Sequence, residues 1–192
     1  MGGNAPGPTE GSLDLIGLVR AARQGDERAW SDLVAEYGPR VFALARSRLR
    51  DMDLAEEVMQ SVFATIAIKL RDGAYDEHGK FEPWLFRIAM NRVRDAVRRA
   101  KRESSEDRLR LAARAEHDAD DADDRPDPRA FEQLRGALDG LSKPDREIVE
   151  LRYHAGLSFR QIAELLGEPI GTLLARHHRA LRKLRAVLEG QG

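Results

Sequence analysis

Apolar residues recur at intervals of three and four positions through most of the chain, which is the spacing of α-helices that bury one face. In the N-terminal half this pattern predicts helices at residues 12–25, 27–49, 54–70 and 83–102. Ser12 can cap the first of them, and Pro39 can kink the second. Together the four stretches predict one small helical domain at residues 12–102.

The C-terminal part repeats the pattern over shorter stretches. Helices are expected to begin at residue 129, after Ser142, after Ser158 and at residue 170. Ser158 can cap the helix that follows it. Tyr153 is expected in the core together with the aliphatic residues of its helix. These stretches predict a second small domain at residues 129–189.

Acidic residues crowd the segment between the two domains. Residues 103–128 contain ten Asp or Glu and four Arg, which gives a formal charge of −6. Such a segment repels itself and lacks apolar periodicity, so we expect an extended linker. Residues 1–11 are rich in Gly and Pro and predict a flexible tail. The expected fold class is therefore all-α, with two small helical domains joined by a flexible acidic linker.

The composition agrees with charged-faced helices around modest cores, because 34% of the residues are charged and only 6% are aromatic. The absence of cysteine excludes disulfides, thiolate nucleophiles and cysteine-ligated zinc. No apolar run approaches the roughly 18–20 residues that span a bilayer. The N-terminus also lacks the basic-then-apolar order of a secretory signal. We expect a cytoplasmic protein with no membrane insertion.

No motif in the sequence indicates catalysis. There is no Gly-rich phosphate loop, nucleophile elbow or Cys/His couple. The five histidines show no metal-ligand spacing, and the adjacent His177 and His178 diverge by about 100° on a helix. Glu56 and Glu57 diverge in the same way and make a poor acid/base pair. We expect no enzymatic activity, no catalytic residue, no metal and no cofactor.

Charge is distributed unevenly, although the formal net charge is only −1. Residues 91–102 carry six cations and one Asp, and residues 170–188 carry five cations and no acidic residue. Helices that contact phosphates have such one-signed faces. Solvated surfaces can be basic too, and cations near a helix C-terminus are stabilising in themselves. Two basic helices on one chain favour a bipartite nucleic-acid binder.

Residues 158–188 have the spacing of a helix-turn-helix motif. This motif needs a small residue where its helices cross, a glycine in the turn and an apolar residue inside the second helix. Ala163, Gly167 and Leu173 stand in these places, and Ile162 and Leu166 are expected on the inner face. The alternative is an ordinary pair of packed helices with solvated arginines.

Residues 26–102 and 131–188 resemble the two conserved domains of bacterial sigma factors of the sigma-70 family, in the extracytoplasmic-function (ECF) subgroup. In the first domain the resemblance is carried by Ala55-Glu56-Glu57, Gln60, Phe63, Trp84-Leu85, Ile88-Ala89, Asn91 and Asp95. In the second domain it is carried by Leu141-Ser142, Arg146-Glu147, Leu151, Ile162-Ala163-Glu164, Gly167 and Gly171-Thr172-Leu173. The combined match is far more specific than either half.

The resemblance implies a factor that binds the beta and beta-prime subunits of core RNA polymerase, brings the enzyme to promoter DNA and helps to melt the duplex. It assigns polymerase binding to Glu56, Glu57 and Gln60, which would otherwise be read as an ordinary solvated face. Capture of an unpaired base of the minus-ten element needs apolar walls, hydrogen-bonding groups and cations. We expect it at loop 71–82, with Trp84 either in the pocket or in the core, and at Asn91, Arg92, Arg94, Arg98 and Arg99.

Recognition of the minus-thirty-five element in the major groove needs the first turns of the second helix of the motif. The resemblance assigns it to Thr172, Leu174, Ala175, Arg176, His178 and Arg179. Leu174 and Ala175 replace a basic residue and a serine that are frequent in the family, so the promoter sequence cannot be carried over. Apolar contact with thymine methyl groups is open to Leu174.

The resemblance also implies a dedicated anti-sigma inhibitor as a partner. The acidic linker either follows the RNA path of the polymerase or serves as a plain tether. Two other functions fit the residues: a stand-alone helix-turn-helix regulator that binds duplex DNA without polymerase, and a protein-interaction module that sequesters transcription components. DNA binding by the chain alone is expected of the regulator and not of a sigma factor.

Overall fold

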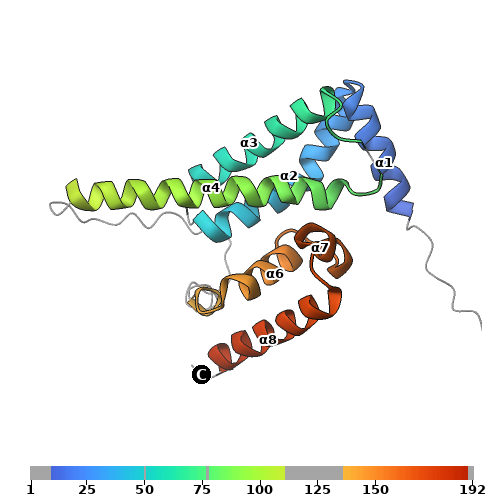
Figure 1. Cartoon of the computed structure of the whole chain (residues 1–192). Coiled ribbons are helices and arrows are strands. Elements are labelled where there is room, and N and C mark those ends of the chain that lie inside the picture. Colours follow the sequence, from blue (N-terminus) through green and yellow to red (C-terminus); the bar gives the residue numbers. More distant parts are fainter. Residues whose placement is uncertain (1–9, 50, 77, 111–135, 190–192) are drawn as a thin grey trace, which may run out of the picture. The chain divides into compact units, whose positions relative to one another are not determined.

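The computed structural model describes residues 10–49, 51–76, 78–110 and 136–189 (Figure 1). Helices and the loops between them make up these ranges, which contain no β-strand. The predicted all-α class is confirmed. Contacts divide the chain into two compact units, Met1–Ala96 and Val97–Gly192, and each is described by itself. Most of the predicted tail and the linker residues 111–128 lie outside the described residues.

The first unit contains α1 (Glu10–Arg23), α2 (Glu27–Leu49), α3 (Met52–Arg71) and the first half of α4 (Phe81–Arg110) (Figure 1). Helix α2 packs against both α1 and α3. Each of these helices buries one apolar side. The largest fully buried side chains of the unit are Leu33, Leu44, Ile66, Leu70, Phe81, Leu85, Phe86 and Met90.

Aspartates begin two of these helices. The Oδ1 atom of Asp26 accepts hydrogen bonds from the backbone N–H groups of Arg28 and Ala29, at 2.9 and 3.1 Å. Asp51 caps α3 in the same way, because its Oδ1 accepts from the N–H of Leu54 at 2.8 Å. Both caps satisfy amides that have no partner inside the helix. Helix α1 begins at Glu10, two residues inside the predicted tail.

Helix α2 continues through Pro39, where the sequence permits a kink. A proline inside a helix removes one backbone hydrogen bond. Its neighbours Gly38 and Val41 are buried, so tertiary packing on both sides of Pro39 supports the uninterrupted helix.

Arg40 ties α2 to the start of α4. Its Nη1 donates to Oε1 of Glu82 at 3.0 Å, and both side chains are only 21% exposed. The guanidinium also lies over the rings of Tyr37 and Phe86, 4.9 and 5.2 Å from their centroids. Burial, and next the charge of Glu82, raise the pKa of Tyr37. These contacts set where α4 begins relative to α2.

Helix α4 is longer than expected at both ends. It begins at Phe81 rather than Pro83, and it continues to Arg110, eight residues into the segment for which an extended linker is expected. Residues 103–110 contain no Gly or Pro and are mostly Arg, Glu and Leu, which are good helix formers. Because their charges are mixed in sign, acidic content alone does not end the helix.

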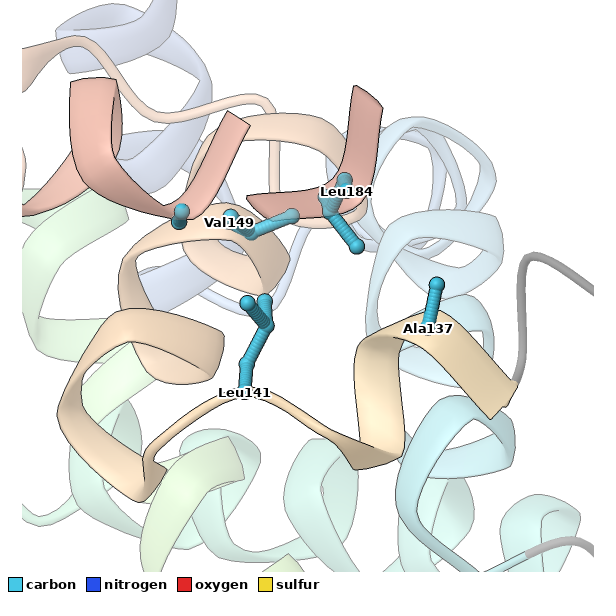
Figure 2. Packing of buried hydrophobic residues seen from close by; sticks show 5 residues of the cluster. Ala137, Leu141, Val149 and Leu184 are labelled. Atoms are coloured by element: carbon cyan, nitrogen blue, oxygen red, sulfur yellow. The ribbon is translucent and has the colours of Figure 1, made fainter. Parts of the chain in front are cut away.

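The second unit contains the second half of α4, a helical turn at residues 136–139, α6 (Lys143–Tyr153), α7 (Phe159–Leu166) and α8 (Ile170–Glu189). Helix α8 packs against both α6 and α7. Leu141, Val149 and Leu184 point toward one another, with Ala137 beside them (Figure 2). Ala180 completes this apolar cluster. The buried row of α8 therefore faces α6 and the residues before it.

A buried ion pair accompanies this apolar cluster. Glu150 is fully buried in α6, and its Oε1 accepts from Nε of Arg146 at 2.6 Å. Nη1 of Arg146 donates to Asp139, also at 2.6 Å. The guanidinium thus joins α6 to the turn at residues 136–139 and satisfies a carboxylate that would be costly to bury alone.

The loop between α7 and α8 has the geometry of a helix-turn-helix. Ser158 and Gln161 form a reciprocal capping box at the start of α7, with distances of 2.8 and 3.2 Å. Gly167 ends the helix in the left-handed conformation, with φ of 69°. Its N–H donates to the carbonyl of Ala163 at 2.8 Å. The expected role of Gly167 as the turn glycine therefore agrees with its backbone conformation.

Two expectations about the core of this unit are wrong. Tyr153 is 59% exposed, because it is the last residue of α6 and lies beyond the apolar cluster. On α7 the buried residues are Ile162 and Leu165, while Leu166 is only partly buried. Leu166 follows the buried Leu165 by one position, and neighbouring side chains on a helix point about 100° apart.

Replacement of Gly167 by Ala is expected to lower the free energy of unfolding by about 1 kcal/mol, because a Cβ is strained at positive φ even though no atom lies within 4 Å of it. Gly171, in the first turn of α8, has equally open surroundings and no positive φ. Gly171→Ala is expected to raise the free energy of unfolding by up to about 1 kcal/mol. Urea unfolding followed by circular dichroism compares the two variants, and a loss of stability in both would contradict the assignment.

Candidate nucleic-acid interface

One row of polar residues runs along the exposed side of α4. Arg87, Asn91, Arg94 and Arg98 follow one another at intervals of four, three and four residues, so they share a side of the helix, and all four are exposed. Nη1 of Arg94 donates to Oδ1 of Asn91 at 3.2 Å. The opposite side is the buried row Leu85, Ala89, Val93 and Ala96. We call the exposed set the α4 basic row.

Arg92 and Arg99 are exposed as well, but they lie about 120° around the helix from the α4 basic row, on a second side of α4. Nη2 of Arg92 donates to Oγ1 of Thr65 in α3 at 2.9 Å. All five residues expected at the minus-ten element are thus exposed on one helix, on two of its sides. Arg87 belongs to the same row and was missed, although its four-residue spacing from Asn91 was visible in the sequence.

An aromatic group surrounds the start of α4. The rings of Tyr75 and Trp84 are stacked, with centroids 4.1 Å apart, and Phe81 packs against both. Tyr75 is 7% exposed, so it is a core residue supplied by the loop before α4. Trp84 is half-buried in this group, and Asn91 follows it by two helical turns, about 10 Å along the axis.

The exposed side of α3 is acidic in its first half. Glu56, Glu57 and Gln60 are all exposed, whereas Ala55, Val58 and Val62 are buried. Nε2 of Gln60 donates to Oε1 of Glu56 at 3.1 Å. Asp53 lies one turn before Glu57, so we call Asp53, Glu56, Glu57 and Gln60 the α3 acidic face. The expected polymerase-binding residues therefore do share one surface.

The expected minus-thirty-five residues divide into two sets on α8. Thr172, Leu174, Ala175, His178 and Arg179 are exposed. Arg176 is different, because its guanidinium contacts the carboxylate of Glu168 in the turn, with Nη1 2.9 Å from Oε1 and 2.7 Å from Oε2. The structure therefore places Arg176 apart from the other five.

His177 lies on the inner side of α8, where it meets two other helices. Its ring stacks on Tyr153 of α6 at 5.8 Å and meets the edge of Phe159 of α7 at 5.0 Å. The Arg152 guanidinium lies 5.6 Å from the centre of the Phe159 ring and donates to the carbonyl of Leu157 at 3.0 Å. Nε2 of His177 is buried and has no hydrogen-bond partner among the described residues. No motif in the sequence indicates a role for His177 in this contact.

Comparisons with known proteins relate both units to one family. The family model described as Sigma-70 region 2 matches residues 33–103, and the model described as Sigma-70, region 4 matches residues 137–186. The RNA polymerase sigma factor CarQ of Myxococcus xanthus is 35% identical over 170 residues, which cover 86% of this chain and 92% of that protein. The chain belongs to the sigma-70 family.

Further relatives place it among the ECF sigma factors. The ECF RNA polymerase sigma factor SigK of Mycolicibacterium vanbaalenii is 30% identical over 185 residues, covering 92% of this chain and 90% of that protein. Among solved structures, CnrH in complex with the cytosolic domain of CnrY matches with a TM-score of 0.66 and 28% identity, covering 92% of this chain and 98% of that one. Bartonella quintana RpoE, solved with the anti-sigma factor NepR, has the same fold, with a TM-score of 0.64 and 24% identity over 83% of this chain and 96% of that one.

The resemblance to ECF sigma factors is thereby confirmed, and with it the function of a sigma factor in transcription initiation. Sigma factors are initiation factors rather than enzymes. In the described ranges no group of three His, Cys, Asp or Glu side chains could hold a metal ion. None of the described helices has the length and apolarity to cross a membrane.

The environment of His177 predicts a pH dependence of region 4. Burial, and next the charges of Arg152 and His178, lower the pKa of His177. Since the folded state then binds fewer protons than the unfolded state, its stability is complete above the ordinary His pKa of about 6.5 and falls as the pH drops through the lowered value. NMR titration is expected to show a His177 pKa below 6.5.

His177→Phe keeps the contacts with Tyr153 and Phe159 but cannot be protonated. Between about pH 7 and pH 5, its unfolding temperature should therefore fall less than that of the unchanged chain. His154, whose pKa is also lowered by burial, titrates in both proteins, so the difference between them isolates His177. A His177 pKa at or above 6.5 would count against the contacts described.

Proposed function

We propose that this sigma factor attaches to core RNA polymerase through the α3 acidic face and contacts promoter DNA through α4 and α8. The observation that carries the proposal is the exposure of all five expected minus-ten residues on α4, where Asn91, Arg94 and Arg98 lie opposite a buried apolar row. A helix with that division presents its cations while its other side holds it in the fold.

For the polymerase contact, the support lies in the charge of the α3 acidic face. Asp53, Glu56 and Glu57 place three carboxylates within two turns, and Gln60 adds a hydrogen-bonding group. Such a surface suits the basic clamp helices of the polymerase that the family resemblance implies. Because the carboxylates are exposed, they act mainly through long-range attraction and orientation.

For the minus-ten element, we propose that the α4 basic row follows the backbone of the separated strand. Arginine side chains form bidentate hydrogen bonds with phosphates and also stack on bases. Asn91 supplies a hydrogen-bonding group between Arg87 and Arg94. Loop 71–82 contributes Tyr75, whose stacking with Trp84 makes a rigid aromatic wall at the start of the row.

For the minus-thirty-five element, we propose that α8 enters the major groove with Ala175, His178 and Arg179 toward the base pairs. These residues lie opposite the buried residues Leu173, Ala180 and Leu184. Thr172 and Leu174 flank them, and Leu174 is 46% exposed, which leaves it available for a thymine methyl group.

We further propose an anti-sigma factor as a regulatory partner and the cytoplasm as the site of action. Both proposals rest on membership of the ECF group, whose members are commonly restrained by such inhibitors. Bartonella quintana RpoE was solved together with the anti-sigma factor NepR. An inhibitor that covers α3 or α8 would prevent the contacts proposed above.

Charge reversal of the α3 acidic face tests the polymerase contact. The double variant Glu56→Lys/Glu57→Lys is expected to bind purified core RNA polymerase about tenfold more weakly or worse, because attraction becomes repulsion. This loss of affinity should become smaller as the salt concentration is raised, because salt screens the repulsion. Glu27→Lys/Asp32→Lys, on exposed positions of α2, changes the net charge equally and should bind like the unchanged chain.

Co-elution on size exclusion, with circular dichroism to verify folding, gives the comparison. Equal binding by the two double variants would overturn the assignment of the α3 acidic face. Tight, specific binding of promoter duplex by the chain without polymerase would instead favour a stand-alone regulator.

A further inference from the structure

Two neighbouring residues of α8, Arg176 and His177, lie at the two edges of its buried row. The buried residues Leu173, Ala180 and Leu184 occupy one side of the helix, and successive residues turn by about 100°. Arg176 therefore borders this row on one edge and His177 on the other. Both edges carry contacts to the rest of the motif, through Glu168 and through Tyr153 and Phe159.

We propose that Arg176 is a positioning residue, which holds α8 in its DNA-reading orientation through Glu168 and does not itself contact DNA. This inference rests on the proposed function of α8 as the helix that reads the minus-thirty-five element. It changes the role of one residue that the family resemblance groups with the readers.

The partner of Arg176 is held rigidly in the turn. Glu168 follows Gly167, whose left-handed backbone directs the chain from α7 to α8. The N–H of Glu168 donates to the carbonyl of Ala163 at 3.2 Å. One residue later, the carbonyl of Pro169 accepts from the N–H groups of Thr172 and Leu173, which begins α8. The backbone that carries the Glu168 side chain is therefore fixed between the end of α7 and the start of α8.

The ion pair is partly shielded from solvent. The side chains of Arg176 and Glu168 are 25% and 32% exposed, and one guanidinium nitrogen meets both carboxylate oxygens. Salt screens the attraction within such a pair less than it screens the attraction within an exposed pair. It also neutralises a carboxylate that lies at the start of the reading helix and would repel DNA phosphates.

The arginines that do suit DNA contact have different surroundings. Arg179 and Arg182 are exposed and lie on the side of α8 opposite its buried row. Arg176 lies about 100° around the helix from Ala175, toward the core. Nη1 of Arg176 is engaged by Glu168, whereas Arg179 and Arg182 extend from the outward side of the helix.

Positioning and direct contact make opposite predictions for the removal of Glu168. If Arg176 contacts DNA, the loss of Glu168 releases a cation and removes a repelling anion, so DNA binding strengthens or stays the same. If Arg176 positions α8, the loss of Glu168 weakens binding as much as the loss of Arg176 does, and the double variant is no weaker than either single variant.

The experiment measures binding of holoenzyme, formed from the full chain and core RNA polymerase, to a promoter fragment mapped from transcripts of the unchanged holoenzyme. We expect Glu168→Ala, Arg176→Ala and the double variant each to lose about tenfold in affinity. Glu168→Gln keeps a hydrogen-bond acceptor for the guanidinium and should retain most of the affinity. Circular dichroism and core binding verify that each variant is folded and assembled.

Salt dependence supplies the control. Arg182→Ala should reduce the slope of log affinity against log salt by about one, as the loss of a phosphate contact does, whereas Arg176→Ala should leave the slope unchanged. Tighter binding by Glu168→Ala, or a slope reduced in Arg176→Ala, would overturn the proposal. Failure of the unchanged holoenzyme to initiate transcripts would instead refute the proposed function.

Discussion

A helix that must bury one row of side chains has only its other half available for charge, and this constraint determines where the functional surfaces lie. On α4 the buried row from Leu85 to Ala96 leaves Arg87, Asn91, Arg94 and Arg98 on the outside. On α8 the buried residues Leu173, Ala180 and Leu184 leave Arg179 and Arg182 outside. The burial of the apolar row thus orients each helix so that its arginines are exposed to solvent.

Apolar burial fixes which side of a helix faces inward but not where the helix begins relative to its neighbours, and in each unit partly buried ion pairs add that information. Arg40 and Glu82 join α2 to the start of α4. Arg146 and the buried Glu150 join α6 to the preceding turn, and Arg176 and Glu168 join α8 to its turn. Such pairs contribute little net stability, yet breaking one leaves a poorly solvated charge, so they favour one arrangement over its neighbours.

The features that the sequence predicts best are those that depend on the helical repeat of apolar residues. The sequence correctly predicts the all-α class, the turn glycine at Gly167 and the exposed sides of α3 and α4, because repetition at three and four residues reports the buried face directly. Predictions from the sequence fail where the burial of a residue depends on the end of its helix or on a partner from another element. Tyr153 has the right spacing for the core but is the last residue of its helix, and residues 103–110 are helical despite their charge.

The same limit applies to the candidate site. Arg176 and Arg179 look alike in the sequence, and only the location of Glu168 separates them. His177 has no distinguishing motif, since its stacking depends on Tyr153 and Phe159, which come from two other helices. Arg87 is the exception, because its spacing from Asn91 was sufficient to find it.

The central claim is that this chain confers promoter selection on a polymerase that lacks it. Sequencing the 5′ ends of RNA made by purified core RNA polymerase on genomic DNA of the source organism, with and without the chain, tests that claim most directly. The account predicts discrete start sites that appear only when the chain is present, preceded by shared sequence elements at the minus-ten and minus-thirty-five positions. Identical, scattered 5′ ends in both reactions would contradict it.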